Sequence, residues 1–171
     1  MRHSAVSRYH WFSGRMSAEF NVRELGSIMA SKGQLTGMTG TFLVAAQLSN
    51  LGFTVSTTSR SAAGADILVT NDECSVAYSV QVKANGKKAN AWLLGNKQPP
   101  QGGKIYIYVF VNLISDKSGV LSAEYFVVPS AIVYKIAILA NESNLESKWR
   151  PYVVMRDKIE KYFNKWGAFK A

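Results

Sequence analysis

The sequence contains very little cysteine and histidine. Cys74 is the only cysteine among 171 residues, so no disulfide can form within the chain and a cysteine-rich zinc site is excluded. The only two histidines, His3 and His10, lie near the N-terminus, which argues against a histidine metal cluster and against a Ser-His-Asp hydrolase site. A single cysteine is typical of proteins in a reducing compartment, and we expect a cytoplasmic protein.

Long apolar runs are also missing. No basic segment followed by a clean apolar stretch opens the chain, so no secretory signal is expected. The longest apolar tracts, residues 105–114 and 125–140, are interrupted by Asn112, Pro129 and Lys135, and their β-branched and aromatic content is typical of buried strands. No membrane span is predicted.

Acidic residues are few relative to basic residues. Eleven Asp and Glu stand against twenty Lys and Arg, which gives a formal charge of +9. This charge favours polyanionic partners and binding that weakens with salt, but it does not distinguish nucleic acid from an anionic membrane. With 47% hydrophobic residues, the chain is long enough for one compact domain with a substantial core.

Three polar residues lie where two neighbouring strands are expected. Asp66 opens an apolar stretch, and after a polar turn at residues 71–73 comes a second stretch in which polar and apolar residues alternate. Because side chains alternate along a strand, Ser79, Gln81 and Lys83 share one face. A hairpin through the turn would bring Asp66 alongside them.

These residue types suit phosphodiester hydrolysis. Mg2+ prefers oxygen ligands, keeps several waters and often takes only one or two carboxylates together with substrate phosphate. Asp66 would supply a carboxylate and Gln81 an amide oxygen to Mg2+ or Mn2+, while the Lys83 ammonium would orient water or stabilise charge on the phosphate. The alternative is a structural ion pair between Asp66 and Lys83, with Gln81 satisfying a neighbouring loop.

The same residues resemble the PD-(D/E)xK nuclease superfamily, which has the restriction-endonuclease-like fold. Asp66 matches the first acidic position, and Gln81-Val82-Lys83 matches the second half of the motif in the Asp…Gln-x-Lys form found in modification-dependent restriction enzymes. The resemblance covers roughly residues 36 to 130, including a preceding helix and a following strand. It implies an α/β fold with a central mixed sheet flanked by helices, and a Mg2+-dependent endonuclease that acts on DNA.

The chain departs from this family at one position. Related sequences commonly carry Glu after the glycine that opens the first helix, where this chain has Thr41. Because Gln also replaces an acid at position 81, one anion remains among the matched positions, which lowers the expected metal affinity. Two functions stay open: an endonuclease with Asp66, Gln81 and Lys83 as catalytic residues, and a catalytically silent module that binds nucleic acid or protein on a nuclease fold.

Basic and aromatic residues after the second of these strands are candidates for nucleic-acid contacts. Lys87, Lys88 and Lys97 flank Trp92 in a segment rich in Asn and Gly. The lysines would contact phosphates and Trp92 would stack on a base; in the alternative, Trp92 packs in the core beside a solvated turn. The expected partner is DNA, although the sequence does not separate DNA from RNA. A homodimer is also considered, because two strands require two cuts.

We expect one domain over residues 1–171, made of an N-terminal arm and helix (1–35), the nuclease-like core (36–130) and a C-terminal helical extension (131–171). A first helix is predicted over residues 17–31. The core is predicted to begin with a helix, followed by an antiparallel meander of three strands at residues 53–58, 65–69 and 76–84. After a connection, two further strands are predicted at residues 104–113 and 124–128, and a helix begins at Ser130.

The core helix is predicted over residues 39–51, with Gly52 as its left-handed cap. The residues expected to face the sheet are Phe42, Ala45, Ala46 and Leu48. Three glycines after the helix predicted over residues 17–31 are interpreted as loop residues: Gly33, Gly37 and Gly40. Near the C-terminus, aromatic and apolar residues fall at helical spacing and are predicted to pack, with the lysines between them available to the nucleic-acid backbone: Ile159, Tyr162, Phe163 and Trp166.

Overall fold

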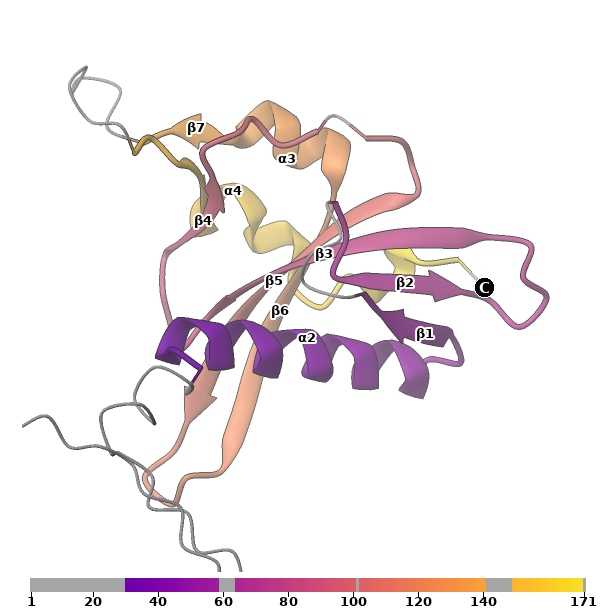
Figure 1. Cartoon of the computed structure of the whole chain (residues 1–171), viewed down its shortest axis with the longest axis horizontal. Coiled ribbons are helices and arrows are strands. Elements are labelled where there is room, and N and C mark those ends of the chain that lie inside the picture. The colour runs from indigo at the N-terminus through magenta and orange to yellow at the C-terminus, as the bar shows by residue number, and fades with distance from the viewer. Residues whose placement is uncertain (1–29, 59–63, 101, 141–148, 171) are drawn as a thin grey trace, which may run out of the picture. The chain divides into compact units, whose positions relative to one another are not determined.

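The computed structural model describes residues 30–58, 64–100, 102–140 and 149–170 (Figure 1). The chain divides after Ser31, and all helices and strands named below belong to Lys32–Ala171. The predicted N-terminal arm and the predicted helix over residues 17–31 lie outside the described residues, apart from Ala30 and Ser31.

A mixed five-stranded sheet forms the centre of this unit, with the strand order β1-β2-β3-β5-β6 (Figure 1). The first three strands form an antiparallel meander, β3 and β5 pair in parallel, and β5 and β6 pair antiparallel. The predicted α/β class with a mixed central sheet is confirmed, and all five strands occur with small shifts at their ends: β1 (Thr54–Thr57), β2 (Ile67–Thr70), β3 (Ala77–Asn85), β5 (Tyr106–Ser115) and β6 (Leu121–Pro129).

A second layer packs on one face of β5 and β6. It consists of a three-stranded sheet in the order β4-β8-β7 and of two helices. Trp92, Val154 and Ile159 of this layer are buried against Tyr108 and Phe126 of the large sheet. The elements of this layer are β4 (Ala91–Gly95), β7 (Ile138–Leu139), β8 (Tyr152–Met155), α3 (Ser130–Ile136) and α4 (Arg156–Ile159).

The C-terminal extension was predicted to be helical, but the structure shows that it is helical only in part. The β-branched run at Tyr152–Met155 pairs with β4 instead, and the segment after α4 forms two short 3-10 turns, Glu160–Tyr162 and Trp166–Ala168. The predicted packing holds for Ile159, which is fully buried. It also holds for Tyr162, which packs between the large sheet and the second layer, and for Trp166, which packs on the core shared by the large sheet and α2. Phe163 remains 42% exposed, although its ring lies 5.5 Å from that of Phe126.

Helix α2 (Lys32–Asn50) covers the opposite face of the large sheet (Figure 1). It starts seven residues before the predicted bound of residue 39, so the interpretation of Gly33, Gly37 and Gly40 as loop residues is wrong. Tertiary packing overrides the low helix propensity of glycine here. A Cβ on Gly40 would lie 2.5 Å from the Ala84 Cβ, so the missing side chain lets α2 approach β3 closely. In the described part of the chain, no helix is both long and apolar enough to span a membrane.

The rotation of α2 agrees with the prediction at Ala45 and Leu48, which pack on the core, and differs from it at Phe42 and Ala46. Its buried positions are Gly40, Val44 and Leu48, spaced by four residues, whereas Phe42 is 57% exposed and Ala46 is exposed as well. The close Gly40 contact sets this rotation. The predicted cap is confirmed at the other end: Gly52 has φ +89°, and the Phe53 N–H donates to the Leu48 carbonyl at 3.1 Å.

The Gly40 contact can be tested with a matched pair of substitutions. Gly40→Ala is expected to lower the free energy of unfolding by about 1–3 kcal/mol, because its methyl group would lie 2.5 Å from the Ala84 Cβ. Gly33→Ala, at a helical position with no atom within 4 Å of the new Cβ, is expected to raise it by up to about 1 kcal/mol. Urea denaturation measures both. Equal stabilities of the two variants would contradict the packing described for α2.

Candidate active site

Asp66 and Gln81 meet where β2 begins. The ladder between β2 and β3 reaches Ile67 opposite Val80, and the Asp66 N–H extends it by donating to the Val80 carbonyl at 2.8 Å. The Asp66 Oδ2 accepts hydrogen bonds from Gln81 Nε2 and from the backbone N–H of Val82, the latter at 2.7 Å. The predicted meeting of a carboxylate and an amide across the hairpin is therefore present.

The turn between β2 and β3 sets this alignment. Asn71 is 6% exposed, and its Oδ1 accepts hydrogen bonds from the backbone N–H groups of Ser75 and Val76 at 3.0 and 3.2 Å. The Cys74 N–H donates to the Asn71 carbonyl at 2.9 Å. Because a slip of one residue would move every side chain to the other face, this closed turn fixes which residues of β3 lie beside Asp66.

Lys83 lies two residues beyond Gln81 on the same face of β3 and is partly exposed. Val80 and Val82 take the other face, where they are buried in the core that includes α2. The described part of the chain contains no ion pair between Asp66 and Lys83, so the structural ion pair considered above is not formed. The face carrying Ser79, Gln81, Lys83 and Asn85 is called the polar face of β3 below.

Two tyrosines of β5 lie next to this carboxylate and were not recognised from the sequence. In the parallel ladder, Gln81 is opposite Tyr108 and Ser79 is opposite Tyr106. Burial is the main cause that raises the pKa of both tyrosine hydroxyls, and the negative charge of Asp66 raises it further. Both hydroxyls therefore stay protonated at neutral pH. The alternation in residues 104–113 placed the two tyrosines on one face, but no local signal gave the parallel register.

A network of polar side chains continues beyond Lys83. The Asn85 Nδ2 donates to the Asn112 Oδ1 at 3.2 Å and to the Ala91 carbonyl at 3.0 Å. Asn112 is fully buried, and its Nδ2 donates to the Ala89 carbonyl at 3.1 Å and to Glu124 at 3.3 Å. These bonds tie the connection between β3 and β4 to the large sheet.

Glu124 is the charged member of this network. Its carboxylate accepts a hydrogen bond from Arg156 at 2.7 Å and forms an ion pair with Lys88 at 3.3 Å. The hydrogen bond from Arg156 is the largest cause that lowers the pKa of Glu124, from 4.5 to about 2. The hydrogen bonds from Asn112 and Lys88 lower it further. The Glu124 carboxylate therefore stays ionised at neutral pH. Its ion pair engages Lys88, which was predicted to contact phosphates.

The predicted nucleic-acid contacts have different surroundings. Lys87, Lys88 and Lys97 are exposed, as a phosphate contact requires. Trp92 is only 1% exposed, its Nε1 donates to the Val111 carbonyl at 3.0 Å, and its ring lies 5.5 Å from that of Phe110. The predicted stacking of Trp92 on a base is therefore wrong, because β4 buries this side chain in the second layer; the alternative, core packing, is correct.

Thr41 does not contribute to the candidate site. Its hydroxyl donates to the Gly37 carbonyl at 3.0 Å within α2, and α2 covers the face of β3 opposite to Gln81. Among the described residues, no group of three His, Cys, Asp or Glu side chains is placed to hold a metal ion. The oxygen donors of this site are one carboxylate and one amide.

The Glu124 network predicts a specific pH dependence of stability. Because the folded pKa is depressed, the stabilisation is present above pH 4.5 and is lost as the pH falls from 4.5 to about 2. Urea denaturation across this range is expected to show a smaller loss of stability for Glu124→Gln than for the wild type. Glu73→Gln, which removes an exposed carboxylate from the β2–β3 turn, is the matched control. If the free energy of unfolding fell with pH equally in Glu124→Gln and in the wild type, the stabilising role of the Glu124 carboxylate would be refuted.

Comparison with known proteins finds a distant structural similarity. No family model and no curated protein matches the chain. Among solved structures, the chain is similar to that of a bacterial homing endonuclease, I-Ssp6803I, with a TM-score of 0.46 and 15% sequence identity over 81% of this chain and 91% of that chain. A similarity at this level does not assign an activity, a substrate or a metal to this protein.

Proposed function

We propose that this protein is a Mg2+- or Mn2+-dependent endonuclease that hydrolyses phosphodiester bonds in DNA. The observation that supports this best is the contact between the Asp66 carboxylate and the Gln81 amide on the face of β3 that also carries Lys83. All three side chains are partly exposed, so a sugar-phosphate strand has access to them. Catalytic sites of this kind need a hard cation, a positioned water and a positive charge near the phosphate.

The donor set fits such a cation. Asp66 Oδ2 already accepts two hydrogen bonds, whereas Asp66 Oδ1 and Gln81 Oε1 accept none from the described residues. One anionic and one neutral oxygen are thus available as ligands, once the Gln81 amide turns its oxygen toward the ion. Mg2+ commonly takes one or two protein carboxylates and completes its shell with waters and substrate phosphate. When bound, the cation would lower the pKa of a water and offset charge on the phosphate.

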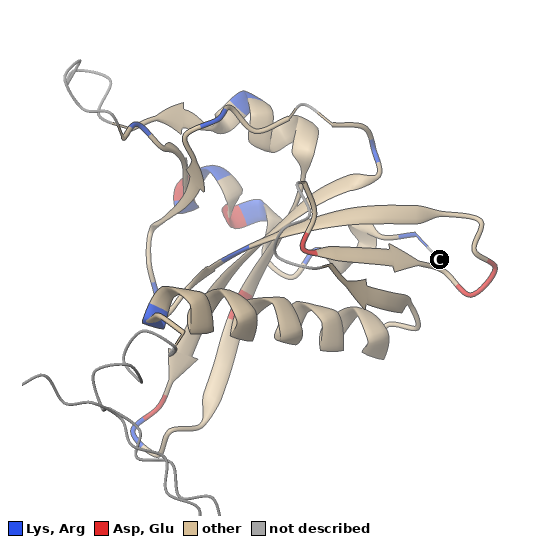
Figure 2. Cartoon of the chain, viewed as in Figure 1, with Lys and Arg blue, Asp and Glu red and all other residues tan. Residues whose placement is uncertain are grey.

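The lysines complete the site in this proposal. Lys83 stabilises the negative charge that develops on the phosphate and orients the attacking water. Lys87 and Lys97 are exposed and contact neighbouring phosphates, in keeping with the net charge of +9. Basic residues occur on several elements of the described chain, whereas α2 carries no charge beyond Lys32 (Figure 2). The nucleic acid therefore lies on the polar face of β3 and not along α2.

A catalytically silent nucleic-acid-binding module is the second candidate. It is favoured by the single carboxylate of the site and by the use of Asp66 Oδ2 to hold the Val82 N–H. In that case the carboxylate would serve the hairpin, and the basic residues alone would bind the polyanion. The two functions differ in whether binding and turnover depend on Asp66 and a divalent cation.

Nuclease activity is tested with two substitutions chosen to preserve the fold. Asp66→Asn keeps an acceptor for the Val82 N–H while removing the charge, and Lys83→Gln removes the ammonium. Both are expected to reduce cleavage of single-stranded and supercoiled DNA with Mg2+ or Mn2+ by roughly 100-fold or more. Lys135→Gln, an exposed lysine on α3, is the control and should cleave like the wild type. Undiminished cleavage by Asp66→Asn would refute the proposed active site.

Binding distinguishes the two candidate functions. If the protein is an endonuclease, Mn2+ is expected to tighten DNA binding by the wild type and to leave Asp66→Asn unchanged, because the carboxylate is the anionic ligand. Fluorescence anisotropy with a labelled oligonucleotide in EDTA and in Mn2+, at fixed salt, measures this. The silent module would instead show the same salt-sensitive affinity in both solutions and in both proteins.

A further inference from the structure

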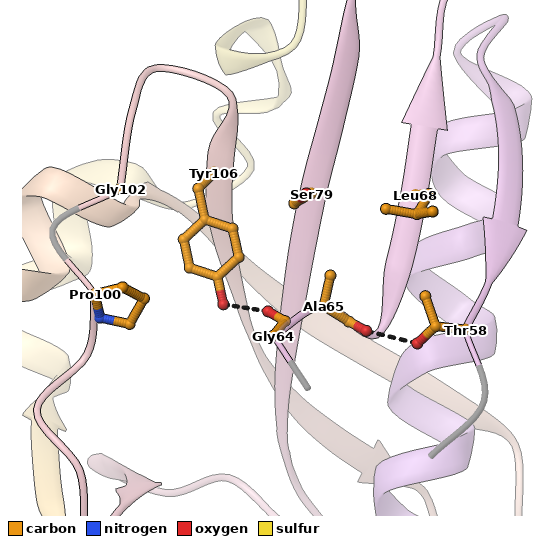
Figure 3. Close-up of a pocket in the computed structure, with 8 residues that line it drawn as sticks. All are labelled: Thr58, Gly64, Ala65, Leu68, Ser79, Pro100, Gly102 and Tyr106. Carbon is orange, nitrogen blue, oxygen red and sulfur yellow. Dashed lines mark hydrogen bonds between the residues drawn. The ribbon is translucent and has the colours of Figure 1, made fainter. Parts of the chain in front are cut away.

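We propose that the pocket beside Asp66 binds a nucleobase of the substrate strand. The pocket has a volume of about 500 Å3 and opens between β2, β3 and the segment that leads into β5 (Figure 3). The side chains that matter for its chemistry come from Leu68, Ser79, Pro100 and Tyr106. This inference rests on the proposed function, because it places a base next to the phosphate held at Asp66 and Gln81.

The position of the pocket follows from the strands. Ser79 precedes Gln81 by two residues on β3, and Tyr106 precedes Tyr108 by two residues on β5. Two residues of strand span about 7 Å, so the pocket is the next row of side chains on the same face of the sheet. Ala65, which also lines the pocket, immediately precedes Asp66. A nucleotide whose phosphate lies at Asp66 therefore reaches the pocket with its base.

The lining suits a base better than a phosphate. None of the described residues that line the pocket is charged, and its surface is largely apolar. Figure 3 shows the Tyr106 ring between Pro100 and the Gly64–Ala65 segment, with its hydroxyl donating to the Gly64 carbonyl. This bond fixes the ring, and a fixed aromatic ring is a stacking partner for any base.

Ser79 supplies the polar contact. Its hydroxyl lines the pocket and has no hydrogen-bond partner among the described residues. A hydroxyl both donates and accepts, so it can pair with the edge of a base that stacks on the Tyr106 ring. An apolar pocket with one aromatic wall and one free hydrogen-bonding group is typical of sites that orient a flat heterocycle.

The pocket also limits the form of the substrate. A base in a duplex is stacked and paired, so it enters a side pocket only if it is single-stranded or has been rotated out of the helix. The protein is therefore expected to prefer DNA that is unpaired next to the bond it cuts. This preference separates the pocket from a general basic surface, which would bind duplex and single strands through their phosphates alone.

The test alters the pocket in the protein and removes the bases from the DNA, one at a time. Binding of fluorescent oligothymidylate, and of a strand of the same length made only of abasic deoxyribose phosphates, is measured in EDTA at fixed salt. Ser79→Leu, which narrows the pocket and removes its free hydroxyl, is expected to weaken oligothymidylate binding roughly tenfold and to leave the abasic strand unchanged. Tyr106→Leu, which removes the stacking ring, is expected to do the same. Ser122→Leu, at an exposed position of β6, is the control, and circular dichroism checks each fold.

The outcomes separate this inference from the proposed function. Equal affinities of Ser79→Leu, Tyr106→Leu and the wild type for oligothymidylate would overturn the base pocket while leaving the endonuclease proposal intact. So would an equal loss on both strands, because a base pocket cannot affect a strand without bases. If the wild type bound neither strand, both the pocket and the nucleic-acid partner would be refuted.

Discussion

The two hydrogen bonds accepted by Asp66 Oδ2 hold the site together. One comes from the side chain of Gln81 and one from the backbone of Val82, so the same oxygen holds the Gln81 side chain and fastens β3 beside the start of β2. A buried N–H left without a partner is costly, which makes this carboxylate important for the hairpin irrespective of any cation. Its second oxygen accepts no hydrogen bond from the described residues. In the proposed active site, that oxygen would bind the cation and the Gln81 amide would exchange its bond to Asp66 for a bond to the ion, while the Val82 bond stays in place.

Strand β3 places different groups at regular intervals along one face. Starting from the N-terminal end, its polar face presents Ser79 to the apolar pocket, Gln81 to Asp66, Lys83 to solvent, and Asn85 to the network around Glu124. Because β3 is held in register with β5 from Ser79 to Asn85, and with β2 as far as Val80, these positions are fixed relative to one another. A rigid strand is a better platform for such a series than a loop.

Much of this face could be read from the sequence, and the reason is local. Alternation in residues 78–84 identified the polar face, and the polar turn after β2 brought Asp66 to it, because an antiparallel hairpin needs only neighbouring residues. The parallel pairing of β3 with β5 joins segments separated by a long connection, so no local pattern placed Tyr108 beside Gln81. Trp92 was ambiguous for the same reason: its burial depends on β8, which lies some sixty residues later in the chain.

The glycines of α2 show a case in which local sequence signals predict the wrong structure. Local propensity favours a loop for a segment with three glycines in eight residues, yet the segment is helical because Gly40 lets the helix lie against Ala84. The contact holds Val82 and Ala84 under α2, and alternation along the strand then turns Gln81 and Lys83 to the other face. A side chain at position 40 would push the helix away from the strand that carries the site. The absence of one methyl group on one face of β3 is thus part of what positions the polar groups on the other.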